Sequence, residues 1–206
     1  MTRSLEANGL ACSRGVTRLF RDVSFHVAMG EWIALRGPNG SGKTTLLRCI
    51  AGLTQPDAGE VRWAGEPVRN AVARFHADLL FAGHLPGIKD DLTAEENLRG
   101  ALSLRGVCPE PAAIRSALAH AGLEKRRNLP ARRLSAGQRR RIGLARLALD
   151  PAPLWMLDEP LTALDDAGQA LFADLLARHL ERGGLAVLAM HHDLAPSPAR
   201  VVRFDA

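Results

Sequence analysis

The sequence is short of cysteine, of long apolar runs and of lysine, and the first two shortages exclude whole classes of protein. Its three cysteines, Cys12, Cys49 and Cys108, are odd in number and far apart, which excludes a disulfide framework and a paired-cysteine metal site. Charged residues interrupt every apolar run well before the roughly 18 residues that a membrane-spanning helix requires. The amino-terminal residues also lack the pattern of a secretory leader. We therefore expect a cytoplasmic protein whose cysteines are small core residues.

Length and charge set a second limit. With 206 residues, 47% of them hydrophobic, the chain can bury one sizeable core but is too short for two independent domains. We expect a single domain over residues 1–206. The net charge is +5, but the arginines are spread along the chain and are not gathered in one tract. A solvated basic surface is expected, and no nucleic-acid partner.

Lysine is the third shortage. Only three of the 27 basic residues are lysines, and one of them, Lys43, completes the G-x-x-x-x-G-K-[ST] pattern of a phosphate-binding loop. A lysine ammonium is a slender point charge that reaches between phosphate oxygens, where the planar guanidinium of arginine fits poorly. The candidate nucleotide contacts are Gly37, Pro38, Asn39, Gly40, Ser41, Gly42, Lys43 and Thr44, with Thr45 next in the chain.

The segments on either side of this loop also fit a phosphate-binding loop. Residues 31–36 are typical of a short buried strand, and residues 44–51 of a helix that Gly52 ends, so the glycines fall in a strand-to-helix turn. There the loop amides and the helix N-terminus face the β- and γ-phosphates, and the Thr44 hydroxyl can bind Mg²⁺. An ordinary glycine-rich turn is the alternative. The sequence predicts that the chain binds a nucleoside triphosphate together with Mg²⁺.

Beyond the loop, short apolar strands alternate with amphipathic helices. Strands are expected over residues 5–12, 23–27, 31–36, 60–63, 79–82, 154–157, 185–189 and 201–204, and strong helices over 135–149 and 167–181. This alternation favours an α/β fold with a mainly parallel sheet. The strand-rich part before Gly30 is expected to form a smaller antiparallel layer. A helical subdomain is expected over approximately 84–150, with a capping box at Thr93 and Glu96.

Two further segments carry chemistry. The apolar strand 154–157 leads directly into Asp158 and Glu159. Such a strand can deliver Asp158 to the Mg²⁺ ion, while Glu159 polarises a water in line with the γ-phosphate. The second segment, LSAGQ, contains Ser135, Gly137 and Gln138. The spacing of Ser135 and Gln138 is also that of an ordinary capped helix.

Taken with the phosphate loop, these segments resemble the ATP-binding-cassette ATPases, whose signature is LSGGQ; Ala136 replaces the first glycine of its pair. The resemblance runs through essentially the whole chain. It matches Asp165 with the family's D-loop, and His191 with its switch histidine, although His192 is an alternative. It also implies a head-to-tail homodimer, in which ATP in one subunit's phosphate loop meets Ser135, Gly137 and Gln138 of the other.

The sequence around His84 indicates a smaller group within the family. These ATPases usually have glutamine there, whereas this chain reads FAGHLPGIKDDLT over residues 81–93. With the LSAGQ variant and the short chain, this stretch is similar to the ATP-binding subunits of bacterial cytochrome c maturation systems, long described as haem exporters. The resemblance implies integral membrane subunits as partners and a peripheral position on the cytoplasmic face of the inner membrane.

His84 takes the glutamine's place in this interpretation, as a catalytic and metal-binding candidate. A neutral imidazole can accept a hydrogen bond near Mg²⁺ or the attacking water, whereas an imidazolium cannot. The alternative is that His84 faces solvent or only packs the loop.

The adenine contact and the process served have open alternatives. The family usually stacks adenine on an aromatic residue ahead of the phosphate loop; the register places Arg14 there, and a guanidinium can stack on a base. Phe20 is the other candidate. The leading function is an ATP-hydrolysing transport motor for haem or another export substrate. A soluble cassette ATPase acting on nucleic acid or ribosomes, and a small phosphotransferase, are the alternatives.

Overall fold

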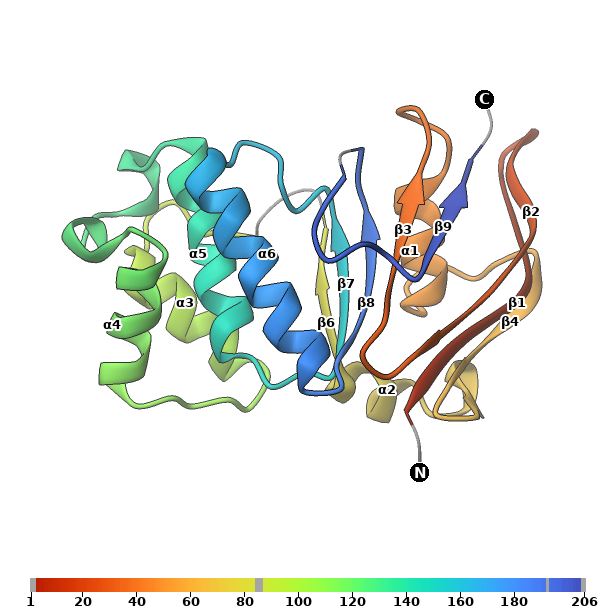
Figure 1. Cartoon of the computed structure of the whole chain (residues 1–206), viewed down its shortest axis with the longest axis horizontal. Helices are drawn as coiled ribbons and strands as arrows, with labels where there is room; N and C mark the ends of the chain where they lie inside the picture. Colours follow the sequence, from red (N-terminus) through yellow and green to blue (C-terminus); the bar gives the residue numbers. More distant parts are fainter. Residues whose placement is uncertain (1–2, 84–86, 192, 205–206) are drawn as a thin grey trace. The chain divides into compact units, whose positions relative to one another are not determined.

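A computed structural model describes residues 3–83, 87–191 and 193–204 (Figure 1). The chain divides into two compact units, each described here by itself. The first unit takes the described residues within 1–84, 152–160 and 177–206, and the second takes those within 85–151 and 161–176. His84 and His192, both candidates from the sequence, lie outside the described residues.

The first unit contains a five-stranded parallel sheet in the order β6-β7-β8-β3-β9. Its strands are β3 (Trp32–Arg36), β6 (Leu79–Ala82), β7 (Leu154–Asp158), β8 (Leu185–Ala189) and β9 (Arg200–Arg203). Every residue of β7 and β8 is buried. Continuous apolar runs of this kind, without polar alternation, are what strands inside a parallel sheet require. The predicted mainly parallel sheet is confirmed.

A second sheet in the same unit is antiparallel, in the order β2-β1-β4-β5. Its strands are β1 (Ser4–Arg14), β2 (Thr17–Ala28), β4 (Ala58–Trp63) and β5 (Glu66–Pro67). The predicted antiparallel layer before Gly30 is confirmed as β1 and β2, and β4 and β5 enlarge it. Helix α1 (Lys43–Ile50) shares one buried core with both sheets, and α2 (Val72–Asp78) adds Phe75 to it.

The second unit is helical. It holds α3 (Ala94–Ser103), α4 (Pro111–His120) and α5 (Ala136–Leu149), with 3-10 turns at Glu124–Arg126 and Ala131–Arg133, and it includes the first part of α6 (Asp166–Glu181). Leu98, Leu118 and Ile142 lie in its separate core. The predicted capping box is present: the Thr93 hydroxyl accepts from the Glu96 amide at 3.1 Å, and Glu96 accepts from the Thr93 amide at 2.8 Å.

A buried asparagine fastens the chain segment that leads into α3. Asn97 is only 6% exposed. Its side-chain NH₂ donates to the carbonyls of Lys89, Leu92 and Thr93, and its carbonyl accepts from the Lys89 amide at 2.7 Å. Because buried polar groups need partners, this one side chain holds residues 89–93 in a fixed loop without regular secondary structure.

A second buried polar side chain, His179 near the end of α6, lies against Trp155 of β7. Their rings stack with centroids 3.8 Å apart and planes at 13° (Figure 1 shows both elements). A ring nitrogen of His179 lies 3.1 Å from the Leu185 carbonyl. Gly184 leaves room for the ring, since a Cβ there would collide with it. Burial lowers the pKa of His179 from 6.5 to about 4, so the ring is neutral at pH 7.

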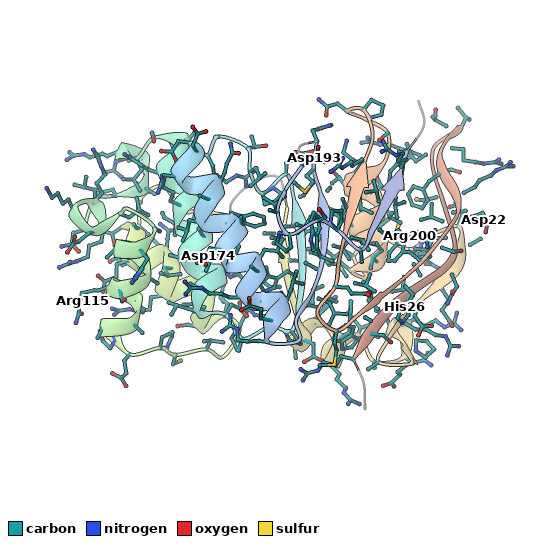
Figure 2. The ribbon with its side chains drawn as sticks, viewed as in Figure 1. Asp22, His26, Arg115, Asp174, Asp193 and Arg200 are labelled. Carbon is teal, nitrogen blue, oxygen red and sulfur yellow. The ribbon has the colours of Figure 1, made fainter. Side chains whose placement is uncertain are left out.

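We predict that acid destabilises the first unit through His179. In the unfolded chain this histidine takes up a proton below pH 6.5, whereas in the folded chain it does so only near pH 4. Stability is therefore complete above pH 6.5 and falls as the pH drops towards 4, by about 3 kcal/mol in total. Urea unfolding of His179→Gln, followed between pH 7 and 4, should show a flatter pH dependence than the wild type. Exposed His26, labelled in Figure 2, supplies the control: His26→Gln should leave the wild-type dependence unchanged.

Candidate active site

Three strands of the parallel sheet end side by side. Ala189, the last residue of β8, is in register with Leu35 of β3 on one side and with Asp158 of β7 on the other. The phosphate loop follows β3, Glu159 follows β7, and His191 lies two residues after β8. The carboxyl edge of a parallel sheet is where α/β proteins bind ligands. The register thus brings three separate sequence segments to one place.

The phosphate loop encloses its lysine. Lys43 is 6% exposed, and its ammonium donates to the carbonyls of Gly37 at 2.7 Å and Pro38 at 2.9 Å. Gly42 precedes α1 at φ 100°, a conformation that favours glycine, and a Cβ there would lie 3.2 Å from Leu19 Cβ. Gly37 is tighter still, because a Cβ would lie 2.7 Å from Phe204 Cβ. The backbone therefore closes around the ammonium only with glycine at these positions.

The loop also presents a polar atom with no protein partner. Among the described residues, nothing hydrogen-bonds the buried Ser41 hydroxyl oxygen. Buried polar atoms are almost always satisfied, and here the neighbouring amides at the start of α1 also lack partners within the helix. A helix N-terminus, an ammonium and a spare hydroxyl together suit a phosphate group.

Two side-chain oxygens meet at the edge of the loop. The Thr44 hydroxyl donates to Asp158 at 2.7 Å, and Asp158 is only 3% exposed. Among the described residues, no group of three or more histidine, cysteine or acidic side chains forms a metal site. Mg²⁺ characteristically takes one or two protein oxygens and completes its shell with water and phosphate oxygens. Thr44 and Asp158 fit that arrangement.

Glu159 and His191 lie beside these oxygens. Glu159 has φ 52°, an unfavourable backbone conformation for a residue with a side chain, and its amide donates to the Ala189 carbonyl at 2.9 Å. His191 Nε2 lies 3.2 Å from Glu159 Oε1 and 3.1 Å from Asn39 Oδ1. Because both neighbours are acceptors, Nε2 carries the proton. One imidazole thus connects the carboxylate to the phosphate loop, a contact that the sequence did not predict for Asn39.

The LSAGQ segment forms the start of α5 in the second unit. The Ser135 hydroxyl accepts from the Gln138 amide at 3.2 Å, and Gln138 Oε1 accepts from the Ser135 amide at 3.0 Å. Ser135 itself is exposed. Gly137 has a packing reason to be glycine, since a Cβ would lie 2.7 Å from the Ala163 carbonyl oxygen. The same end of α5 is therefore capped, accessible and closely packed against residue 163.

Asp165 follows that close contact. It accepts from the Gly168 amide at 3.0 Å and from Arg141 at 2.5 Å. These two donors, the amide first, hold the pKa of Asp165 below its usual value. The sequence did not predict the pairing with Arg141, because the run 139–141 has no pattern that assigns one arginine to one partner.

The two candidates for the adenine contact differ in exposure. Arg14 ends β1 and is exposed. Phe20 is 6% exposed and packs edge-on against Phe204, with ring centroids 6.1 Å apart. A base can stack only on an accessible face, so this geometry favours Arg14 over Phe20.

Comparisons with known proteins find a matching family and similar chains. The family described as ABC transporter matches residues 20–162. The "Cytochrome c biogenesis ATP-binding export protein CcmA" of Methylococcus capsulatus is 47% identical over 188 residues, 91% of each chain. That of Pseudomonas aeruginosa is 46% identical and covers 98% of this chain and all of its own.

Solved structures show the same fold. An ABC transporter ATP-binding protein from Pyrococcus furiosus superposes with a TM-score of 0.85 at 23% identity, covering 98% of this chain and 97% of its own. A dimeric ATP-binding cassette bound to ADP and Pi gives 0.82 at 23% identity, covering 98% and 94%. The α/β fold expected from the sequence is the fold of these proteins.

We predict that Gly137→Ala destabilises the second unit although alanine is the better helix former. Propensity alone would stabilise the helix by up to about 1 kcal/mol, but the overlap with the Ala163 carbonyl costs about 1–3 kcal/mol. Ala136→Gly is the matched variant and should cost less than about 1 kcal/mol. Chemical denaturation measures the free energy of unfolding of both variants. A Gly137→Ala variant more stable than the wild type would show that the Ala163 carbonyl leaves room for a Cβ at residue 137.

Proposed function

The chain belongs to the ABC transporter family, and from this premise we propose that it is the ATP-hydrolysing subunit of a membrane export complex that serves cytochrome c biogenesis. ATP binding and hydrolysis follow from the family. The export role rests on its extensive similarity to proteins named for cytochrome c biogenesis export. The observation that carries the proposed chemistry is the meeting of Lys43, Glu159 and His191 at one sheet edge. Family membership also excludes the small phosphotransferase considered from the sequence.

Lys43 and the loop amides bind the triphosphate in this proposal. The ammonium gives up its two carbonyl acceptors, both within 3 Å, for β- and γ-phosphate oxygens, whose negative charge makes stronger hydrogen bonds. The Ser41 hydroxyl acquires the partner that it lacks within the described chain. Gly37, Pro38, Asn39, Gly40, Gly42 and Thr45 complete the proposed cradle, and Arg14 stacks on the adenine.

Thr44 and Asp158 would hold Mg²⁺, with His84 as a further proposed ligand or water contact. When bound, this ion neutralises charge on the phosphates. The Thr44 hydroxyl donates a hydrogen bond to Asp158 at 2.7 Å, which leaves the lone pairs of its oxygen available for an ion. Both groups lie on rigid elements, because Thr44 is in the first turn of α1 and Asp158 ends β7.

Glu159 orients the attacking water and accepts its proton. His191 donates from Nε2 to this carboxylate or to Asn39, which fixes Glu159 relative to the phosphate loop. Glu159 points into the site because its backbone turns at φ 52° directly after β7. A strained conformation is tolerated where the surrounding structure holds it, and here the amide of Glu159 is bonded to β8.

Two copies are needed for a complete site. Ser135, Gly137 and Gln138 of one copy contact the γ-phosphate held by the loop of the other, and the exposed start of α5 supplies amides and a positive helix end. Integral membrane subunits of the cytochrome c maturation complex receive the motion of this dimer, on the cytoplasmic face of the inner membrane, in the handling of haem. In the described part of the chain, no helix is both long enough and apolar enough to cross a bilayer.

We predict that Glu159→Gln retains ATP binding and loses turnover. The amide keeps the size of the side chain but cannot accept the proton, a loss of about 10² to 10⁴ in rate. Phosphate release and equilibrium ATP binding are measured on the chain purified with its membrane partners. Hydrolysis within a factor of two of the wild type would rule out this role for Glu159.

Lys43→Ala should fail at the earlier step. Removing the ammonium takes away charge that stabilises bound phosphates, so ATP affinity falls, whereas Glu159→Gln leaves it unchanged. Calorimetric titration of both variants with MgATP makes the comparison. Equal affinities would contradict the division between binding and hydrolysis.

A further inference from the structure

The segment that carries His191 is attached to the sheet mainly by side chains. Its last backbone hydrogen bond after β8 joins the Met190 amide to the Leu35 carbonyl at 3.2 Å, and the next joins the Ala199 amide to the Trp32 carbonyl at 2.9 Å. Between them, described residues 191 and 193–198 make no backbone-to-backbone hydrogen bond with another described residue. The position of His191 therefore depends on side-chain contacts.

One of these contacts is an ion pair beside the phosphate loop. Arg36 Nη2 lies 2.5 Å from Asp193 Oδ1. Arg36 ends β3 directly before Gly37, and Asp193 follows His191 by two residues; Figure 2 labels Asp193 beyond the ends of β3 and β8. The Arg36 side chain is only 20% exposed, although that of Asp193 is 93% exposed. The pair thus connects the segment that carries His191 to the strand that leads into the phosphate loop.

We propose that Arg36 and Asp193 are positioning residues that hold His191 between Glu159 and Asn39. This inference rests on the proposed function, in which His191 fixes the carboxylate. Two residues of chain reach at most about 7 Å, so anchoring Asp193 confines His191 to a small volume. Its Nε2 must stay within hydrogen-bond range of oxygens now at 3.2 and 3.1 Å.

Arg36 is suited to this role because it is largely withdrawn from solvent. Its Nε is buried and has no hydrogen-bond partner in the described chain, so the guanidinium has given up hydration on one side. Asp193 is the acidic group that compensates it. Most exposed ion pairs contribute little. This one differs because one partner is fixed at a strand end, and the other lies on a segment that His191 and one further hydrogen bond, from the Trp32 indole to the Pro196 carbonyl at 2.9 Å, also hold.

The alternative is that Arg36 acts only as a positive charge near the phosphates. The two explanations predict different effects on ATP binding when each partner is replaced. Arg36→Gln removes a cation and Asp193→Asn removes an anion, so a pure charge effect would weaken ATP binding in the first variant and strengthen it in the second. Loss of positioning instead lowers kcat in both variants and leaves the KM for ATP unchanged.

The test compares these variants in the chain purified with its membrane partners. We expect each single variant to lower kcat by about two- to fivefold, and the double variant to lose no more than either one. The reversed pair, Arg36→Asp with Asp193→Arg, should recover part of the loss. Arg203→Gln is the control: Arg203 is exposed, is the register neighbour of Arg36 on β9 and has no ion pair within the described chain. Its kcat should be that of the wild type.

Unchanged kcat in both single variants, ATP affinities that shift in opposite directions, or additive losses without recovery would overturn the inference. Glu159→Gln is measured in parallel, because the proposed function predicts that this variant loses turnover whether or not Arg36 and Asp193 position His191. If Glu159→Gln keeps its turnover, the proposed function fails; if only the Arg36 and Asp193 variants behave like the wild type, the positioning inference fails.

NMR of the full chain with labelled histidine observes His191 directly and does not depend on turnover. The His191→Gln variant identifies the His191 resonances. The His191 resonances should move towards those of a free imidazole in Asp193→Asn but not in Arg203→Gln. Identical His191 shifts in the wild type, Asp193→Asn and Arg203→Gln would contradict positioning.

Discussion

The register of β8 with its two neighbours is the constraint on which the site depends. Ala189 pairs with Leu35 on one side and Asp158 on the other, so the three chain segments that leave these strands emerge at one edge. A slip of one residue would reverse every side chain, and because every residue of β7 and β8 is buried, each reversed side chain would have to fit the packing of the opposite face. The chemistry of the site thus depends on packing several residues away from it.

Hydrogen bonds then set the positions within this edge. Lys43 is held by two loop carbonyls, Thr44 by Asp158, and Glu159 by the Ala189 carbonyl and His191. In the proposed reaction, phosphate oxygens replace the loop carbonyls around Lys43, while Mg²⁺ and water join Thr44, Asp158 and Glu159. The protein therefore holds these groups at one sheet edge before the nucleotide binds, and Lys43 exchanges its loop carbonyls for phosphate oxygens on binding.

Much of the fold was predictable because its signals are local. The apolar runs of β6 and β8 have the predicted bounds, and the capping boxes at Thr93 and Ser135 are determined by residues three positions apart. The roles of the predicted site residues remain a prediction. In the structure, the phosphate loop, Asp158 and His191 lie at or just after the ends of neighbouring strands. The short strand β5 and helix α2 were not predicted, because β5 spans only two residues and α2 seven, too few for periodicity to be visible. Pairs such as Arg141 with Asp165, or Arg36 with Asp193, join residues far apart in sequence, and a single sequence does not indicate which arginine meets which carboxylate.

The most direct test of the account is a structure of the chain with a non-hydrolysable ATP analogue and Mg²⁺. We predict that the triphosphate lies at the carboxyl ends of β3, β7 and β8, with Lys43 moved from the carbonyls of Gly37 and Pro38 to phosphate oxygens. Ser135 of a second copy should contact the γ-phosphate. A triphosphate bound elsewhere, or a γ-phosphate contacted by one copy alone, would contradict the shared site at this sheet edge.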